Sequence, residues 1–204
     1  MLKVLGFDDG YFPYSFKGMK GKTIVSCVLT LNPNPGHVVP RLINITEVYV
    51  DQPEVTLEAY ETCSKCLEES RGIEAESILL LDGITYAGFS VIDVNKLYSM
   101  LRVPIIVVFM YDLELDKIEY ALKKHFKDWN YRYNILYDVY SVSTKVETPK
   151  GPLRIYVKGL SLNRALNVIL STQVHSRTPE PLRIAHLTAS AISRALQGRL
   201  RASN

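Results

Sequence analysis

The segment Ser77–Gly83 (SILLLDG) is an apolar run that stops at an Asp-Gly pair. A short apolar run that ends in a turn signal is typical of a central strand covered on both faces. Pro104–Met110 (PIIVVFM) is a second run of this kind, and a helical pattern from about Asn95 to Leu101 lies between the two. Because buried strands that alternate with helices are typical of a parallel sheet, we predict an α/β fold.

Three strands are expected before this unit. They are predicted at Lys3–Asp8, Thr23–Leu31 and Arg41–Val50, where β-branched or alternating apolar residues are bounded by turn signals. Successive strands joined by short turns favour an antiparallel meander. The sheet should therefore be mixed, with three antiparallel strands followed by parallel strands and flanked by helices.

A helix is expected between Glu54 and Ser70, because apolar or small residues recur there at spacings of four, four and three. Two of them are Cys63 and Cys66, whose spacing superficially suggests zinc or redox chemistry. A structural zinc site needs four ligands, and Cys27 is the only other cysteine. We therefore expect the cysteines to be small core residues.

The rest of the chain is expected to complete one domain, residues 1–204. A helix at about Leu115–Phe126, a hairpin of Ser141–Glu147 with Leu153–Val157, and helices at about Leu162–Ser171 and Pro181–Leu196 are predicted. The aromatic stretch Trp129–Tyr140 has tyrosines at alternate positions, which fits a strand or loop edge. These rings could stack on bases, but packing in the core or at a sheet edge is favoured.

Composition excludes several classes of protein. The chain has 204 residues, 47% of them hydrophobic and 22% charged, which is ordinary for a globular domain. No apolar run approaches the roughly 20 residues of a membrane helix, and Asp8 and Asp9 interrupt the region where a signal peptide would be apolar. We expect a cytoplasmic protein without a membrane span.

The charges are unevenly distributed. Lys150–Asn204 holds nine lysines and arginines but a single acid, Glu180, so this quarter carries +8 although the whole chain carries only +3. Basic residues neutralise phosphates, so the quarter could contact a polyanion. On charge alone, a basic coat on solvated helices is the favoured interpretation.

Carboxylates follow the ends of the predicted strands. Asp8 and Asp9 close the first strand, Asp82 closes the first buried run, and Glu54 opens the helix between them. Residues just past strand ends line the ligand crevice of an open α/β sheet. Such oxygen ligands suit Mg²⁺ or Mn²⁺. The alternative is structural, since Asp-Gly is a common turn and acids are common helix caps.

Three motifs resemble the archaeal endonuclease V-like family, formerly a domain of unknown function and associated with deoxyuridine endonuclease activity. They are Gly6–Gly10 (GFDDG), Leu81–Asp93 (LDGITYAGFSVID) and Pro179–Leu187 (PEPLRIAHL). The resemblance covers almost the whole chain. It implies a ribonuclease H-like fold and a nuclease that acts on nucleic acid, with DNA favoured.

The resemblance also implies a site. Asp8, Glu54 and Asp82 match the family's metal ligands, with Asp51 or Glu58 as alternatives to Glu54. Asp8, Asp9 and Asp82 would be catalytic.

Four further residues are candidates for substrate binding. Thr85 and Tyr86 belong to the family's own motif, and Tyr86 could stack on a base or be packed and hydrogen-bonded. Arg183 and His186 lie three apart on the last predicted helix, so they share a face. They could hold a phosphate together or pair with acids near the site.

Two departures from endonuclease V bear on catalysis. Its histidine six residues after the Asp-Gly aspartate is replaced here by Gly88, and its lysine at the end of the next strand is replaced by Met110. The expected activity is a metal-dependent cleavage of nucleic acid near a deaminated base. A nucleic-acid-binding protein with little catalysis, or an RNA nuclease, are the alternatives.

Overall fold

The computed structural model describes residues 1–32 and 34–202, without the side chains of residues 199–202. Pro33 of the expected loop after the second strand, and Arg199 and Arg201 of the basic quarter, therefore lie outside the described side chains. No helix within the described ranges is long and apolar enough to cross a membrane.

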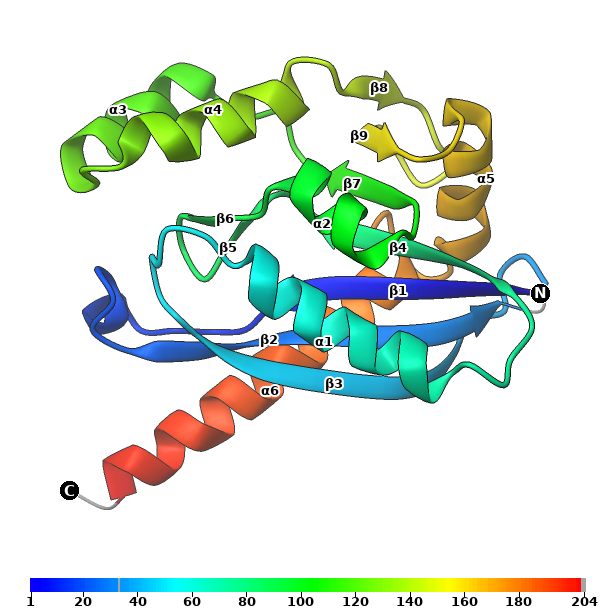
Figure 1. Ribbon diagram of the computed structural model, residues 1–204, viewed down its shortest axis with the longest axis horizontal. Helices are drawn as coiled ribbons and strands as arrows, with labels where there is room; N and C mark the ends of the chain where they lie inside the picture. The colour runs from blue at the N-terminus through cyan, green and yellow to red at the C-terminus, as the bar shows by residue number, and fades with distance from the viewer. Residues whose placement is uncertain (33, 203–204) are drawn as a thin grey trace.

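One mixed sheet organises the chain (Figure 1). The strands lie in the order β3-β2-β1-β4-β7-β9-β8. Their bounds are β1 Leu2–Asp9, β2 Lys22–Asn32, β3 Val39–Tyr49, β4 Glu76–Asp82, β7 Ile105–Phe109, β8 Thr144–Val146 and β9 Leu153–Lys158. The first three strands pair antiparallel, and β1, β4 and β7 pair parallel, as predicted. The last two strands are an antiparallel hairpin on the β7 edge.

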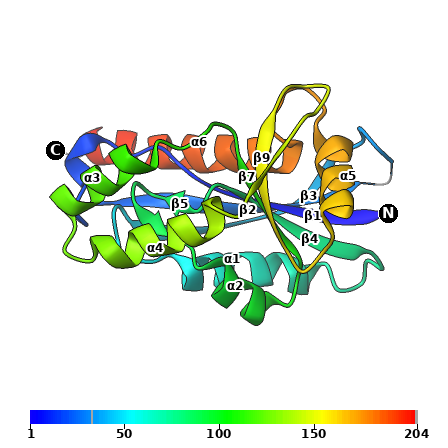
Figure 2. The same cartoon turned by 90° about the horizontal axis from the view of Figure 1, so that it is seen from above.

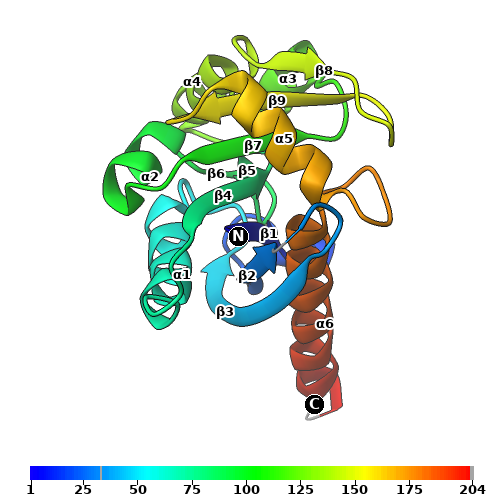
Figure 3. The same ribbon diagram turned by 90° about the vertical axis from the view of Figure 1, so that its right-hand side faces the viewer.

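Helices cover both faces of the sheet (Figures 2 and 3). On one face lie α1 (Thr56–Glu69) and α2 (Val94–Leu101), and on the other lie α5 (Leu162–Thr172) and α6 (Glu180–Ala202). The helices α3 (Leu115–His125) and α4 (Trp129–Tyr140) pack on each other. A short 3-10 helix, η1 (Tyr14–Phe16), and a small β5 (Thr85–Tyr86) and β6 (Ser90–Val91) hairpin complete the fold.

The sheet separates two apolar cores because successive strand residues point to opposite faces. Phe7, Leu79 and Leu81 face α1 and α2, and the three cysteines are buried in the same core, as expected. Val4 and Leu80 face α5 and α6 and pack with Leu182 of α6. The last residues of β1 and β4 on the face of Val4 and Leu80 therefore continue the rows of buried side chains that face α5 and α6.

The expectation of a strand or loop edge over the aromatic stretch is wrong, because Trp129–Tyr140 is the helix α4. Its buried residues Arg132, Leu136, Val139 and Tyr140 are spaced by four, three and one, so they share one helix face. The tyrosines at alternate positions obscured this spacing. The ring of Tyr140 packs against Phe109 at the end of β7.

Two glycines let α6 lie directly on β1. A Cβ atom on Gly6 would lie 2.2 Å from the carbonyl oxygen of Pro181, and one on Gly10 would lie 2.5 Å from that of Ala189. Ser26 of the next strand donates a hydrogen bond to the Ala185 carbonyl at 2.7 Å. The GFDDG motif therefore serves packing at its two glycines, while its two aspartates are left for other roles.

The substitution Gly6→Ala is expected to destabilise the protein by about 2–3 kcal/mol, because backbone must move to admit the new methyl group. Chemical denaturation measures this change. Gly72→Ala is the matched control, since a Cβ there meets open space. Equal midpoints for the two variants would contradict the proposed close packing.

Candidate active site at the ends of β1 and β4

Asp8 and Asp82 lie side by side at the same edge of the sheet. Phe7 of β1 is the register partner of Leu81 of β4, so the next residues along the two parallel strands are these aspartates. Neighbouring strands are about 4.8 Å apart. The two carboxylates therefore share the face of the sheet that α6 covers, as predicted from the strand ends.

The carboxylate of Asp8 is buried and incompletely satisfied. Its Oδ1 accepts a hydrogen bond from the Asp9 amide at 2.7 Å, and its Oδ2 lies 3.0 Å from Nδ1 of His186. No well-formed hydrogen bond reaches Oδ2 from the described residues. Burial raises the pKa of Asp8, and the contacts with His186 and the Asp9 amide oppose this shift only in part.

Asp82 and Asp9 are also difficult to ionise. Burial, followed by the negative charge of Asp8, raises the pKa of each to about 7. The Asp9 carboxylate accepts a hydrogen bond from the Ala87 amide, so Asp9 anchors the β5–β6 hairpin to the end of β1. Three acids held this close favour a bound proton or a cation.

His186 joins the cluster from α6. Its pKa is raised, chiefly by contact with Asp8, and its side chain is 57% exposed. Contact with Asp8 therefore favours the protonated imidazole, and more than half of the side chain remains accessible to a ligand. Of the two roles weighed for it, the structure places it against an acid of the site.

An open pocket of about 350 Å³ contains the cluster. Its lining residues come from the ends of β1, β4 and β7 and the residues that follow them, from β5 and from α6; they are Asp8, Asp9, Asp82, Gly83, Thr85, Val108, Phe109, Met110, Tyr111, Leu113 and His186. Met110 follows β7 on the face of the two aspartates. Its side chain packs against the apolar core between the sheet and helices α5 and α6. The position that carries lysine in endonuclease V is thus within the pocket but uncharged.

Glu54 is not brought to this pocket. Its carboxylate forms a salt bridge with Lys96 at 2.7 Å and accepts a hydrogen bond from the Tyr131 hydroxyl. These contacts lower the pKa of Glu54 although burial opposes them. Glu54, expected as the third metal ligand, thus links α2 to α4 in this structure and does not line the pocket.

The alternatives to Glu54 have other partners too. Asp51 accepts hydrogen bonds from the amides of Gly18 and Phe89, and Glu58 accepts one from Gln52. Neither acid lines the pocket.

The substrate-binding candidates are divided. Thr85 lines the pocket, whereas Tyr86 is only 1% exposed and packs edge-on against Phe7. Its hydroxyl donates a hydrogen bond to the Gly83 carbonyl at 3.2 Å. The buried ring is therefore part of the core and is not exposed to stack on a base. Arg183 forms an ion pair with Glu180 in the first turn of α6. Like His186, it therefore contacts an acid, which is the second of the two roles considered for it.

Arg132, which in the sequence could belong to a base-stacking platform with the nearby tyrosines, instead holds the hairpin from outside. Arg132 of α4 is 2% exposed and donates to the carbonyls of Asp51, Gln52 and Phe89 at 2.7–3.0 Å. Asp128 balances its charge through two hydrogen bonds. A lone arginine on a helix gives no sequence signal of these carbonyl contacts, because the three carbonyls lie 43 to 81 residues away.

Gly88, at the tip of the hairpin, has a φ of +92°. A Cβ there would lie 2.2 Å from Oδ1 of Asp51. The hairpin therefore requires glycine at the position where endonuclease V has histidine.

Residues 1–193 match one family model, described as endonuclease dU. The chain belongs to the endonuclease dU family. Relatives include the UPF0215 protein of Thermococcus sibiricus, 36% identical over 94% of this chain and 92% of the relative. The UPF0215 protein of Pyrococcus furiosus is 35% identical over 95% and 93%. The predicted family is thus confirmed.

Solved structures share the fold of this endonuclease dU family member. A protein of unknown function from Archaeoglobus fulgidus superposes with a TM-score of 0.75 at 23% identity, over 94% of this chain and 98% of the other. Human ENDOV has a TM-score of 0.60 at 16% identity over 96% and 86%. Endonuclease V of Ciona intestinalis has 0.59 at 15% identity over 98% and 87%. The predicted mixed α/β fold is confirmed.

The donor set suits Mg²⁺ better than a metal that needs a full protein cage. Within residues 1–32 and 34–202, no three His, Cys, Asp or Glu side chains converge closely enough to form a ready-made metal site. Mg²⁺ often uses only one or two carboxylates, with waters and substrate phosphates as its other ligands. Asp8 and Asp82 fit this pattern, and Oδ2 of Asp8 accepts no well-formed hydrogen bond although the His186 imidazole lies beside it.

In a chelating buffer at pH 8, Asp82→Asn is expected to raise the melting temperature by at least about 2 °C, or about 1 kcal/mol for this size. The pKa of Asp82 rises from 3.8 in the unfolded chain to about 7 on folding. Its buried charge thus costs most above pH 7, and this cost falls as the pH drops through 7 towards 4.

Scanning calorimetry at pH 8 and pH 5 tests this prediction. The gain should be smaller at pH 5, and Glu61→Gln on the exposed face of α1 should give no gain at either pH. A lower melting temperature for Asp82→Asn at pH 8 would show that the carboxylate is stabilising.

Proposed function

We propose that this protein is a divalent-metal-dependent endonuclease that cleaves nucleic acid near a deaminated base, with deoxyuridine in DNA as the favoured substrate. One observation carries the proposal: Asp8 and Asp82 lie at adjacent parallel strand ends in an open pocket, with His186 against Asp8. Membership of the endonuclease dU family supports the same reaction. The related fold of an endonuclease V solved with inosine-containing DNA supports a nucleic-acid substrate. The cytoplasm is the proposed site of action.

The division of labour follows from the contacts. Asp8 and Asp82 would hold Mg²⁺ or Mn²⁺, and such an ion would polarise the phosphodiester and activate the attacking water. His186, whose pKa is raised chiefly by contact with Asp8 and whose side chain is half exposed, would donate a proton to the leaving oxygen. Asp9 positions the hairpin, which presents Thr85 to the pocket.

The substitutions Asp8→Asn and Asp82→Asn are each expected to lower cleavage by at least about 100-fold, because changing even an indirect metal partner costs 10- to 100-fold. The assay uses Mg²⁺ and end-labelled DNA strands that differ only in one base, which is uracil, hypoxanthine or thymine. Glu61→Gln is the matched control for loss of an exposed acid.

An RNA strand and a chelator complete the assay. Cleavage by wild type and both variants alike would refute the site. Strand binding with no cleavage by wild type would favour a nucleic-acid-binding protein, and preferential cleavage of RNA would favour an RNA nuclease.

Glu54→Gln is expected to keep cleavage within about tenfold of wild type, because this carboxylate contacts Lys96 and Tyr131 rather than the pocket. The same end-labelled deoxyuridine strand measures the rate across a range of Mg²⁺ concentrations. If Glu54→Gln lowered the cleavage rate as much as Asp82→Asn does, and higher Mg²⁺ restored the rate, Glu54 would be identified as a metal ligand.

A further inference from the structure

A second pocket, of about 200 Å³, adjoins the candidate active site. The two pockets share Phe109, Met110 and Tyr111, the residues at the end of β7. The rest of the second pocket is lined mainly by charged side chains. Lys145, Arg154 and Arg177 face it together with a single acid, Asp112.

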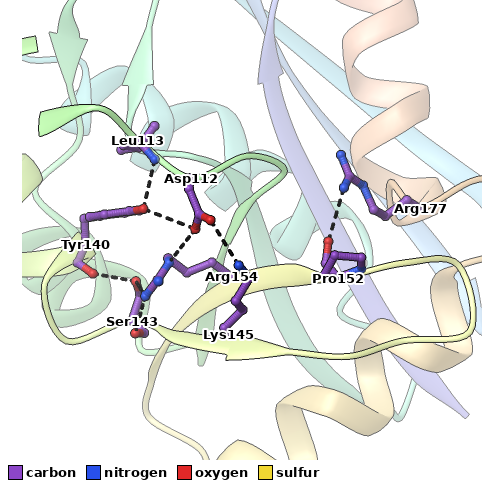
Figure 4. A network of polar contacts seen from close by, with 8 residues as sticks. All are labelled: Asp112, Leu113, Tyr140, Ser143, Lys145, Pro152, Arg154 and Arg177. Carbon is purple, nitrogen blue, oxygen red and sulfur yellow. Dashed lines mark hydrogen bonds and ion pairs between the residues drawn. The ribbon is translucent and has the colours of Figure 1, made fainter. Parts of the chain in front are cut away.

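Two of these cations are placed directly opposite each other. Lys145 of β8 and Arg154 of β9 are register partners in an antiparallel pair. Like charges at such positions repel and destabilise a hairpin. Asp112 offsets part of this repulsion by bonding Lys145 at 3.1 Å and Arg154 at 3.3 Å (Figure 4).

The third cation comes from a distant part of the chain. Arg177 lies between α5 and α6, and it reaches the hairpin to donate to the Pro152 carbonyl at 3.3 Å (Figure 4). Its guanidinium lies 5.0 Å from the centre of the Tyr111 ring, which is 76% exposed. A charged and aromatic surface therefore borders the active-site pocket.

The cluster is left with positive charge and unused donors. Lys145 and Arg154 lower the pKa of Asp112, so this acid is ionised and neutralises only one of three cations. A guanidinium has five N–H donors, and Arg177 uses one of them on Pro152. Arg154 is fixed by stacking on Tyr140 at 4.9 Å and by a 2.9 Å bond to the Ser143 carbonyl.

We propose that Lys145, Arg154 and Arg177 form a subsite for a backbone phosphate of the nucleic-acid strand whose neighbouring phosphodiester occupies the Asp8–Asp82 pocket. This inference rests on the proposed function, because it takes the strand to enter that pocket. Phosphate contacts of this kind set the register of a strand without reading its sequence. The exposed Tyr111 ring offers a stacking surface for the adjoining base.

The test measures binding rather than cleavage. A labelled deoxyuridine strand is titrated by fluorescence anisotropy in the Asp82→Asn background, with and without the pair Lys145→Gln and Arg177→Gln, over a series of salt concentrations. The pair should weaken binding about tenfold at low salt. It should also reduce the slope of log K against log salt by about one to two.

Two matched controls separate this site from general charge. The pair Lys65→Gln and Lys124→Gln removes two exposed cations from α1 and α3, and it should leave affinity and slope unchanged. The pair Lys145→Arg and Arg177→Lys keeps both charges and should keep most of the slope. Melting temperatures of all variants verify that the hairpin remains folded.

Several results would overturn the subsite. These are an unchanged slope for the Gln pair, an equal change in the distant pair, or no strand binding by the parent chain. Inorganic phosphate that stabilises the parent and not the Gln pair, while strand binding is unaffected, would identify a free-anion site instead. Absence of cleavage by wild type refutes only the proposed nuclease, since the binding result stands independently.

Discussion

The close approach of α6 to β1 is the constraint on which the site depends. Because Gly6 and Gly10 have no side chains, the backbone of α6 can contact the backbone of this segment. Three residues of α6 are fully buried at this contact: Leu182, Ala185 and Ala189. This contact sets the height of the helix above the sheet. It brings an imidazole from near the C-terminal end of the chain to a carboxylate near the N-terminal end. Folding therefore assembles the site only after the last helix has packed.

The cost of the site lies in its uncompensated acids. Asp8 is buried, Asp9 and Asp82 are partly buried beside it, and the half-exposed His186 is their one basic neighbour among the residues that line the pocket. The amide of Ala87 and the amide of Asp9 satisfy single oxygens and leave the rest of the charge unpaired. A scaffold selected for stability alone would replace such groups with apolar ones. Their retention at a pocket opening is understandable if a cation and a phosphate complete the charge balance.

Much of the fold was predictable because its signals are local. Apolar runs end at Asp82 and Met110, and the strand that carries Asp8 is equally clear, so both aspartates could be placed at one sheet edge. Glu54 could not be excluded, since its salt bridge depends on where α2 and α4 pack. Tyr86 illustrates the same limit, because only the tertiary structure decides whether a ring in a glycine-rich hairpin is packed or exposed.

The hairpin tip has a consequence for protein engineering. Gly88 adopts a left-handed conformation against the side chain of Asp51, and Asp51 in turn holds the amides of Gly18 and Phe89. A histidine grafted at position 88 to imitate endonuclease V would therefore have to displace the acid that ties together three separate loops. Any side chain introduced at position 88 therefore needs accompanying changes in the turn that contains Asp51.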